Sequence, residues 1–247
     1  MRSRSRGLVG GPAVSWSPEQ LTPKIFFDAG YVEAVGTGTW TARYNAATVA
    51  ATLTESTSEP DTAAGGYPDF ERANSDRLTG VDITGNPLTD FVGLGACTTL
   101  TVLDVESIAD KGVEIYHSDP IVTDKSGYHG LHLANIAGTP KGIFWQYDGA
   151  VKSVTVTVGA SGRVVLAAKK VGGALKITAN GTDWTTGDAC GNLDAGASTA
   201  IPLWVGSSFY AAGKSYDGII RALVLDSVAW SDADVLSFYA WAAARYP

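Results

Sequence analysis

The feature that most constrains the fold is a series of short apolar segments between residues 151 and 181, divided by glycine-containing turns. In the first segment, Val154, Val156 and Val158 alternate with hydroxyl side chains, which is typical of an antiparallel strand with one buried face. Strands are predicted next at 163–168 and 174–179. Short strands at this spacing favour a sandwich or jelly roll over an alternation of strands and helices.

The turns in this region carry their own predictions. Gly172-Gly173 separates the second and third segments, and Asn180-Gly181 follows the third. The Asn-Gly pair predicts a tight type I′ hairpin, because both central residues of that turn need positive φ.

Apolar and β-branched residues predict further strands at 24–29, 98–107, 112–117, 129–136 and 143–147. In segment 98–107 the apolar phase shifts at Val102-Leu103. That shift indicates either a β-bulge or a strand covered on both faces.

One helix is predicted, at the C-terminal end. Ser231 is a favourable N-cap, Asp232 and Asp234 suit the positive first turn, and Arg245 suits the last. Apolar residues recur at helical spacing from Val235 onward, so we expect the helix to cover one edge of the sandwich. We assign Trp204, Trp230 and Trp241 to the core and to the helix interface.

We expect residues 1–20 to form a flexible or assembly arm and residues 21–247 to form a single domain. A domain of this size buries a large core and needs no disulfide or metal to be stable. The net charge is −7, and three of the arginines lie within the first six residues. Such an acidic body argues against nucleic acid as a partner, because phosphate contacts need clustered Lys or Arg. The arm offers a route to a homo-oligomer or to virion assembly.

Neither a secretory signal nor a membrane span is expected, since no apolar run is long enough. We therefore expect a virion or an extracellular surface reached without a recognisable signal peptide, and otherwise the cytoplasm. Without an export signal, Cys97 and Cys190 are better interpreted as two buried thiols than as a disulfide.

Three stretches resemble the laminin G-like, concanavalin A-like jelly-roll domains of the bacterial or phage type. They are Phe26 to Asp28, the hairpin ending at Asn180-Gly181, and Trp204 to Tyr246 with its strand, Asp217-Gly218 step, buried strand and capped helix. The resemblance implies an all-β fold, a two-sheet antiparallel jelly-roll sandwich with Greek-key connections and a C-terminal helix. It also implies glycan or protein binding.

No cofactor is expected, although the resemblance raises the possibility of calcium at a sheet rim. Its turn-adjacent candidate ligands are Asp76, Asp148 and Asp217, and each is also explained as an ordinary turn residue.

Catalytic constellations are not expected. Asp104 and Glu106 lie two apart on a strand, but a solvated strand end explains them better than a glycosidase pair. His129 and His132 are three apart, so their rings should face opposite sides of a strand. We therefore predict a protein that is not an enzyme.

Sugar binding uses aromatic rings that stack on C–H faces, beside amides and carboxylates that bond hydroxyls. A dense set of such groups spans residues 145–148, and more lie nearby. The candidate ligand-binding residues are Tyr128, His129, Trp145, Gln146, Tyr147, Asp148, Asp183 and Trp184. The alternative is that Trp145 and Trp184 fill the core.

The sequence thus favours a non-catalytic jelly-roll module that binds a glycan or a surface protein on a particle or cell surface. A phage virion structural protein, such as a tail or capsid-decorating subunit, is the alternative. A polysaccharide-cleaving enzyme is the second alternative.

Overall fold

The structure is a computed structural model, and it describes residues 16–29, 35–36, 39–41, 44–45, 52–55, 61–63, 67–72, 76, 78–80, 95–108, 113–118, 129–191, 203–206 and 216–247.

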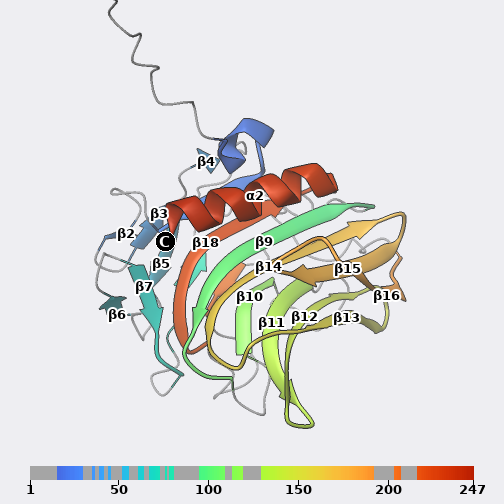
Figure 1. Cartoon of the computed structure of the whole chain (residues 1–247), viewed down its shortest axis with the longest axis horizontal. Coiled ribbons are helices and arrows are strands. Elements are labelled where there is room, and N and C mark those ends of the chain that lie inside the picture. Colours follow the sequence, from blue (N-terminus) through green and yellow to red (C-terminus); the bar gives the residue numbers. More distant parts are fainter. Residues whose placement is uncertain are drawn as a thin grey trace, which may run out of the picture.

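Two antiparallel sheets form the described protein. The strands of sheet A are β1 (Ile25–Asp28), β4 (Tyr44–Asn45), β6 (Asp61–Ala63), β7 (Tyr67–Phe70), β9 (Cys97–Val105), β14 (Gly162–Val171), β15 (Ala174–Ala179), β16 (Thr185–Ala189) and β18 (Gly218–Asp226). Seven of them run in the order β16-β15-β14-β9-β18-β1-β4, while β7 pairs with β18 and β6 pairs with β7. Figure 1 shows the long strands β18, β9 and β14 curving together through the molecule.

Sheet B lies opposite sheet A. Its strands are β2 (Val35–Gly36), β3 (Thr39–Thr41), β5 (Thr52–Glu55), β8 (Leu78–Gly80), β10 (Val113–Ser118), β11 (His129–Ile136), β12 (Thr139–Tyr147), β13 (Val151–Thr157) and β17 (Leu203–Val205). They run in the order β13-β12-β11-β10-β17-β8-β5-β3-β2.

The chain passes repeatedly from one sheet to the other. Strand β9 belongs to sheet A, β10 to β13 belong to sheet B, and β14 to β16 return to sheet A beside β9. Strand β17 lies in sheet B and β18 lies again in sheet A, between β9 and β1. The predicted all-β, two-sheet antiparallel sandwich is confirmed, and this passage between sheets is typical of a jelly roll.

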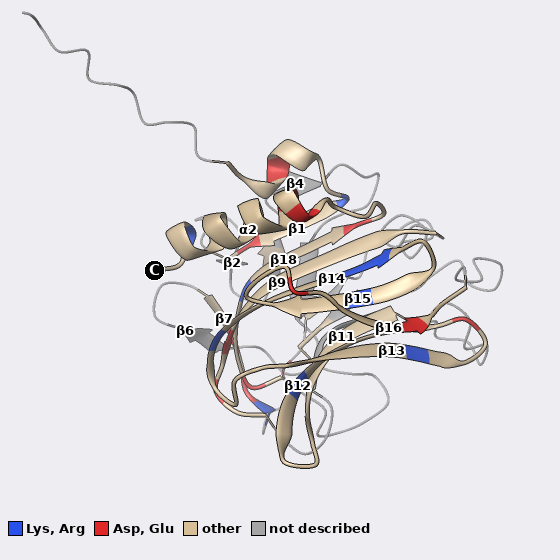
Figure 2. Cartoon of the chain, turned by 45° about the vertical axis from the view of Figure 1, so that its right-hand side comes forward, with Lys and Arg blue, Asp and Glu red and all other residues tan. Residues whose placement is uncertain are grey.

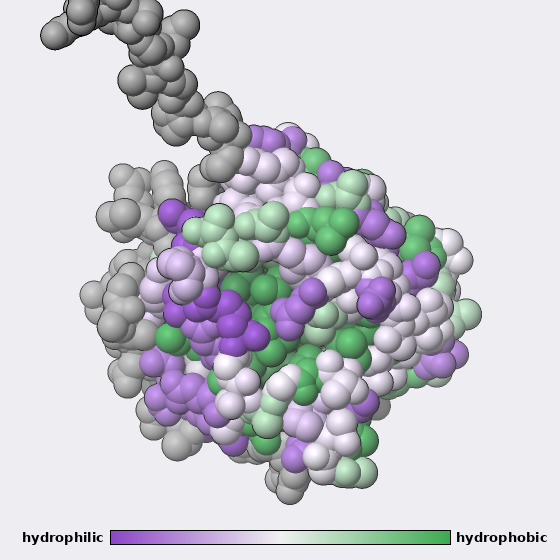
Figure 3. Space-filling view, viewed as in Figure 1, coloured by the Kyte–Doolittle hydropathy of each residue, from purple (hydrophilic) through white to green (hydrophobic). Residues whose placement is uncertain are grey.

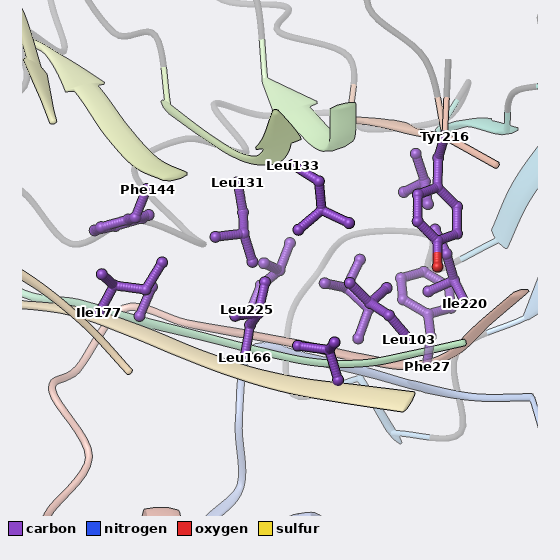
Figure 4. Close-up of a cluster of buried hydrophobic side chains, with 14 of the residues drawn as sticks. Phe27, Leu103, Leu131, Leu133, Phe144, Leu166, Ile177, Tyr216, Ile220 and Leu225 are labelled. Carbon is purple, nitrogen blue, oxygen red and sulfur yellow. The ribbon is translucent and has the colours of Figure 1, made fainter. Parts of the chain in front are cut away.

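The main core fills the space between the sheets. Figure 4 shows Leu131, Leu133 and Phe144 of sheet B pointing toward side chains of sheet A such as Leu166 and Ile177. In β13, Val154 is buried in this core, and Val156 and Val158 pack against it. The predicted alternation of this strand is therefore confirmed.

A second core lies on the outer face of sheet A, beneath the helix α2 (Asp232–Arg245). Val235, Phe238, Trp241 and Ala242 of α2 are buried there. They pack with residues of the central strands, including Leu100 of β9. The helix therefore covers a face of sheet A, and the expectation that it would cover an edge of the sandwich is wrong.

This helix explains the buried strand 98–107. Because α2 covers the outer side of sheet A and sheet B covers the inner side, almost every residue of β9 is buried. The register shift lies in the neighbouring strand β18, between Ile220 and Ala222. Of the two alternatives, coverage on both faces applies to β9.

The predicted N-cap is confirmed. The Ser231 hydroxyl accepts the Asp234 amide at 3.2 Å, and the Asp234 carboxylate accepts the Ser231 amide at 3.3 Å. Trp230 and Trp241 lie in the second core as expected. The side chain of Trp204 lies outside the described residues.

Residues 16–20, which the sequence prediction included in the arm, contact the second core. A 3-10 helix, η1 (Pro18–Leu21), buries Pro18. Trp16 meets Trp230 edge-on at 6.5 Å between ring centroids. The rest of the predicted arm lies outside the described residues.

The turns differ from the prediction. Gly172 and Gly173 have φ of 58° and 78°, so the tight hairpin with two left-handed residues joins β14 to β15. At the predicted site, Asn180 has φ of 55° but Gly181 is not in the left-handed region. The type I′ prediction for Asn180-Gly181 is wrong, because Asn180 instead pairs back to β14, where its side chain accepts the Val165 amide at 2.9 Å.

Among the described helices, none has the length and apolar character that a membrane crossing requires.

Candidate functional site

Strand alternation divides the predicted ligand-binding residues. His129 and Gln146 face each other in register on β11 and β12, and both side chains are buried between the sheets. Trp145 and Tyr147 alternate with Gln146 and therefore lie on the outer face of sheet B. Tyr128 lies outside the described residues.

The inward pair belongs to a buried polar cluster. One hydrogen of the Gln146 amide nitrogen reaches His129 Nδ1 at 2.9 Å, and the other points to Cys97 Sγ at 3.4 Å. Cys190 donates its thiol hydrogen to the Gln146 carbonyl oxygen at 3.4 Å. Since Gln146 donates to Nδ1, His129 carries its proton on Nε2. In this cluster the polar groups bond one another inside the sandwich.

The two cysteines are free and buried, as predicted. Burial raises the pKa of the Cys97 thiol to about 12, although Lys170 and Gln146 act in the opposite direction. Burial also raises the pKa of Cys190. Because the thiolate is the reactive form, neither cysteine is a candidate nucleophile.

Asp148 lies in the turn after β12 and bonds the backbone just beyond β16. Its carboxylate accepts the backbone amide of Gly191 at 2.6 Å, and this hydrogen bond is the main cause of its lowered pKa. The other calcium candidates have similar roles: Asp76 accepts the Glu71 amide at 2.8 Å, and Asp217 pairs with Arg72 at 3.4 Å. In the part of the chain that the structure describes, no group of three or more acidic, His or Cys side chains is suited to a metal.

Trp184 lies on the other side of the sandwich, against α2, and its chain neighbour Asp183 is exposed. The Trp184 indole donates to Asp232 at 3.0 Å, and Lys169 Nζ lies 4.2 Å from its ring centroid. Trp184 also packs against the second core. The structure therefore does not bring these two residues together with Trp145.

The outward residues of β12 form the remaining candidate. The backbone of Gly130 on β11 faces Trp145 on β12. A Cβ atom added at Gly130 would lie 2.6 to 2.9 Å from Nε1, Cε2 and Cζ2 of the Trp145 indole. The ring therefore lies across β11 in the space that a side chain at position 130 would occupy. His132 is beside it, with ring centroids 6.5 Å apart.

Polar side chains surround this indole on the same face. The register places Ser153 of β13 opposite Trp145, and Thr155 opposite Ile143. In the next row, Lys141 donates to the Thr157 hydroxyl at 2.7 Å. We call the outer face formed by Gly130, His132, Lys141, Ile143, Trp145, Tyr147, Ser153, Thr155 and Thr157 the Trp145 face. It combines an aromatic ring with hydroxyl groups.

The sequence prediction missed Gly130, His132 and the hydroxyl groups of β13. Gly130 is not itself chemically conspicuous, and its importance depends on the register that sets it opposite Trp145. The alternation of β13 was visible, but the pairing of β13 with β12 was needed to place its hydroxyls beside the ring.

The two carboxylates considered for catalysis, Asp104 and Glu106, lie in different environments. Asp104 accepts from Arg163 at 2.7 Å and from Arg221 at 2.5 Å, whereas Glu106 is exposed. Burial alone would raise the pKa of Asp104, but the hydrogen bonds and charges of the two arginines outweigh burial and lower it. A carboxylate held by two guanidinium groups is a poor proton donor or nucleophile.

Several known structures share this architecture. The binding domain of botulinum neurotoxin DC in complex with rat synaptotagmin II has a TM-score of 0.60 at 10% identity, over 89% of this chain and 51% of that chain. Domain 4 of AbnA, a GH43 extracellular arabinanase from Geobacillus stearothermophilus, in complex with arabinotriose, has a TM-score of 0.56 at 12% identity. That match covers 89% of this chain and 98% of that chain.

A sialidase from Trypanosoma rangeli is also similar, with a TM-score of 0.58 and 7% identity over 89% of this chain. This chain spans about a third of the matched sialidase chains and about half of the matched toxin chains. No protein-family model matches the chain, and no curated protein sequence matches it. At these identities the comparisons establish the fold alone, an antiparallel β-sandwich of the kind found in these binding domains.

Proposed function

We propose that the protein is a non-catalytic module that binds a glycan on the Trp145 face. The observation that carries the proposal is the close approach of the Trp145 indole to Gly130. An aromatic side chain in a sheet usually stands up from its own strand. Here the ring leans across the neighbouring strand and is only partly buried, and an aromatic face of this kind can stack on the C–H face of a sugar.

The surrounding groups suit a ligand rich in hydroxyls. Ser153 and Thr155 can both donate and accept hydrogen bonds, and the neutral His132 ring has one donor and one acceptor nitrogen. Lys141 is the single charged side chain among the residues defined as the Trp145 face, and the Thr157 hydroxyl accepts from it. We therefore favour a neutral oligosaccharide over a highly charged one.

The solved structures support a binding role through their own ligands. The arabinanase domain forms a complex with arabinotriose, and cell entry of botulinum neurotoxin type C depends on interaction with two ganglioside molecules. The binding domain of botulinum neurotoxin DC forms a complex with rat synaptotagmin II, so a protein partner is the alternative occupant of the same face. The ion pairs of Asp104 with Arg163 and Arg221 support the non-catalytic part of the proposal.

The setting of the module is a further part of the proposal. A laminin G-like domain on a particle or cell surface, or a virion subunit, agrees with the low fraction of charged residues, 17%, and with the arginine-rich first residues.

The experiment is a binding screen of the full chain against immobilised neutral and acidic oligosaccharides, including arabinotriose and ganglioside oligosaccharides, with release of reducing ends followed in parallel. For each oligosaccharide that binds, Trp145→Ala and Gly130→Ala are compared with Gly181→Ala. A Cβ at Gly181 meets nothing within 4 Å, so this variant controls for the loss of a glycine.

We expect Trp145→Ala to weaken binding by roughly tenfold or more, equivalent to about 1.4 kcal/mol. Gly130→Ala should weaken it as well, because the added methyl displaces the ring. Gly181→Ala should bind like the wild type. Binding that is insensitive to Trp145→Ala would refute the proposed site, and release of reducing ends would refute the non-catalytic role.

A further inference from the structure

The outer face of α2 is unusual for a helix in contact with solvent. Its charged residues are confined to the two ends, with Asp232 and Asp234 in the first turn and Arg245 in the last. The segment 235–244 contains no charged side chain. On the side away from sheet A, Leu236 is 51% exposed. Figure 3 shows pale green and green patches, interrupted by weakly polar atoms, along the upper part of the molecule where α2 lies.

Two hollows flank the part of the helix from Ser237 onward. One, of about 400 Å³, is lined on one side by Trp16 and on the other by Ala240 and Ala244 of α2. The other, of about 380 Å³, lies between Ala243 of α2 and Arg163 of β14. An apolar ridge with a hollow beside it is self-complementary in shape, because the ridge of a second copy can enter the hollow of the first.

The charges at the two ends of α2 also suit a second copy of this chain. Beyond the acidic first turn, Asp183 lies next to Trp184, which bonds Asp232. At the other end of the helix, Arg163 lies by the second hollow and Arg245 occupies the last turn. Figure 2 shows α2 with a basic residue near its C-terminal end and an uncharged middle. In an antiparallel pair of these helices, the acidic end of each copy would meet the basic end of the other.

These charged groups already have partners within the chain. Asp232 accepts from Lys169 at 2.7 Å through Oδ1, and Arg245 lies 3.3 Å from Asp28. The bonds use one oxygen of a carboxylate that is 59% exposed and some of the five donors of a guanidinium. The exposed Asp232 carboxylate can therefore also contact a second molecule.

We propose that α2 is a self-association surface, on which the α2 helix of a second copy of this chain packs antiparallel across a two-fold axis. Alanines at the contact allow a short distance between helix axes, about 8 Å. Antiparallel helix dipoles and the opposite end charges favour this orientation. A helix of 14 residues is only about 21 Å long, so the dimer should be weak and depend on concentration.

Sedimentation velocity of the full chain over a wide concentration range tests the proposal. We expect the wild type to shift from monomer to dimer as concentration rises, and Ala240→Glu to remain a monomer, because it puts two carboxylates into the contact. Val171→Glu, at an exposed apolar residue of another hairpin, should dimerise like the wild type. A wild type that stays monomeric, or a dimer that survives Ala240→Glu, overturns the proposal.

Crosslinking gives a second readout that does not depend on a disruptive charge. The native Cys97 and Cys190 are buried, so a cysteine introduced on the surface is the preferred target for a short bis-maleimide. Ala240→Cys should yield a covalent dimer, and Val171→Cys should not. Equal crosslinking of the two variants would contradict the proposed contact.

A third variant separates this contact from assembly through the N-terminal residues. A chain without residues 1–15 should dimerise at least as well as the full chain if α2 makes the contact. If the deletion abolishes the dimer while Ala240→Glu leaves it intact, the N-terminal segment makes the contact and the proposal is wrong.

Discussion

The two outer faces of the sandwich carry similar side chains with different partners. On sheet A, Trp184, Trp230 and Trp241 pack around α2 and are bound by the chain's own groups, such as Asp226, which accepts the Trp230 indole at 2.7 Å. On sheet B, Trp145 leans over Gly130 beside hydroxyl groups. The role of an aromatic residue in this fold therefore depends on what covers its ring. Rings covered by α2 belong to a structural core. The Trp145 ring lies over a residue without a side chain, Gly130, and offers an aromatic surface for binding.

The largest effect should come from the core beneath α2. Phe238→Ala removes a fully buried ring that packs 5.5 Å from Trp241. We expect a loss of about 3–5 kcal/mol in the free energy of unfolding, measured by denaturant titration. Leu236→Ala on the exposed side of the same helix should change it by less than about 0.5 kcal/mol under monomeric conditions. Similar losses in both variants would show that α2 does not depend on sheet A.

The ion pairs at the end of sheet A should give the next effect. Asp104→Asn weakens the bonds to Arg163 and Arg221 and should cost about 1–2 kcal/mol at neutral pH. The pKa of Asp104 is lowered in the folded protein. Its contribution is therefore complete above the unfolded pKa, about 4, and is lost as pH falls through the folded pKa.

The measurement is the free energy of unfolding between neutral and acid pH. The wild type should lose stability more steeply below about pH 4 than Asp104→Asn does. Parallel curves would mean that Asp104 is not the carboxylate responsible.

The comparison of Trp184 with Trp145 involves a loss of stability of similar size at Trp184 and gives the sharpest contrast. Trp184→Ala breaks the bond to Asp232 and the contact with Lys169, so it should lower stability by about 1–2 kcal/mol and leave glycan binding unchanged. Its matched variant, Trp145→Ala, should lower stability by about 1 kcal/mol or less but weaken binding. Thermal melts and binding isotherms of the two variants check this, and an exchange of the two phenotypes would reverse the comparison.

Capping of α2 should make a small contribution to stability. Ser231→Ala removes the acceptor of the Asp234 amide and should cost about 1 kcal/mol. Ser231→Asp keeps an acceptor and should restore most of that loss. Denaturant midpoints of the two variants would contradict the role of the cap if they were equal.

Local patterns predicted those parts of the fold that depend on neighbouring residues. The alternation of Val154 and Val156 with hydroxyl residues identified β13, and Ser231 with Asp234 identified the start of α2. The turn at Asn180-Gly181 failed because Asn180 bonds to Val165 of another strand, a contact between residues distant in the sequence. The position of α2 on the face of sheet A likewise depends on strands that come together only in the folded chain.

The candidate site shows the same limit. Residues 145–148 were identified by their chemistry, but β12 directs Gln146 inward and Trp145 outward. Trp184 has suitable chemistry but lies beside Asp232 on the opposite side. Gly130 could be recognised only after the register set it opposite Trp145.

The central claim is that the two outer faces differ in function, with binding on sheet B and support on sheet A. The most direct measurement is a titration of indole N–H signals by NMR, using an oligosaccharide that binds in the screen, with each signal assigned by substitution. We expect the Trp145 signal to shift while those of Trp184 and Trp230 stay in place. A shift of Trp184 with an unchanged Trp145 signal would contradict it.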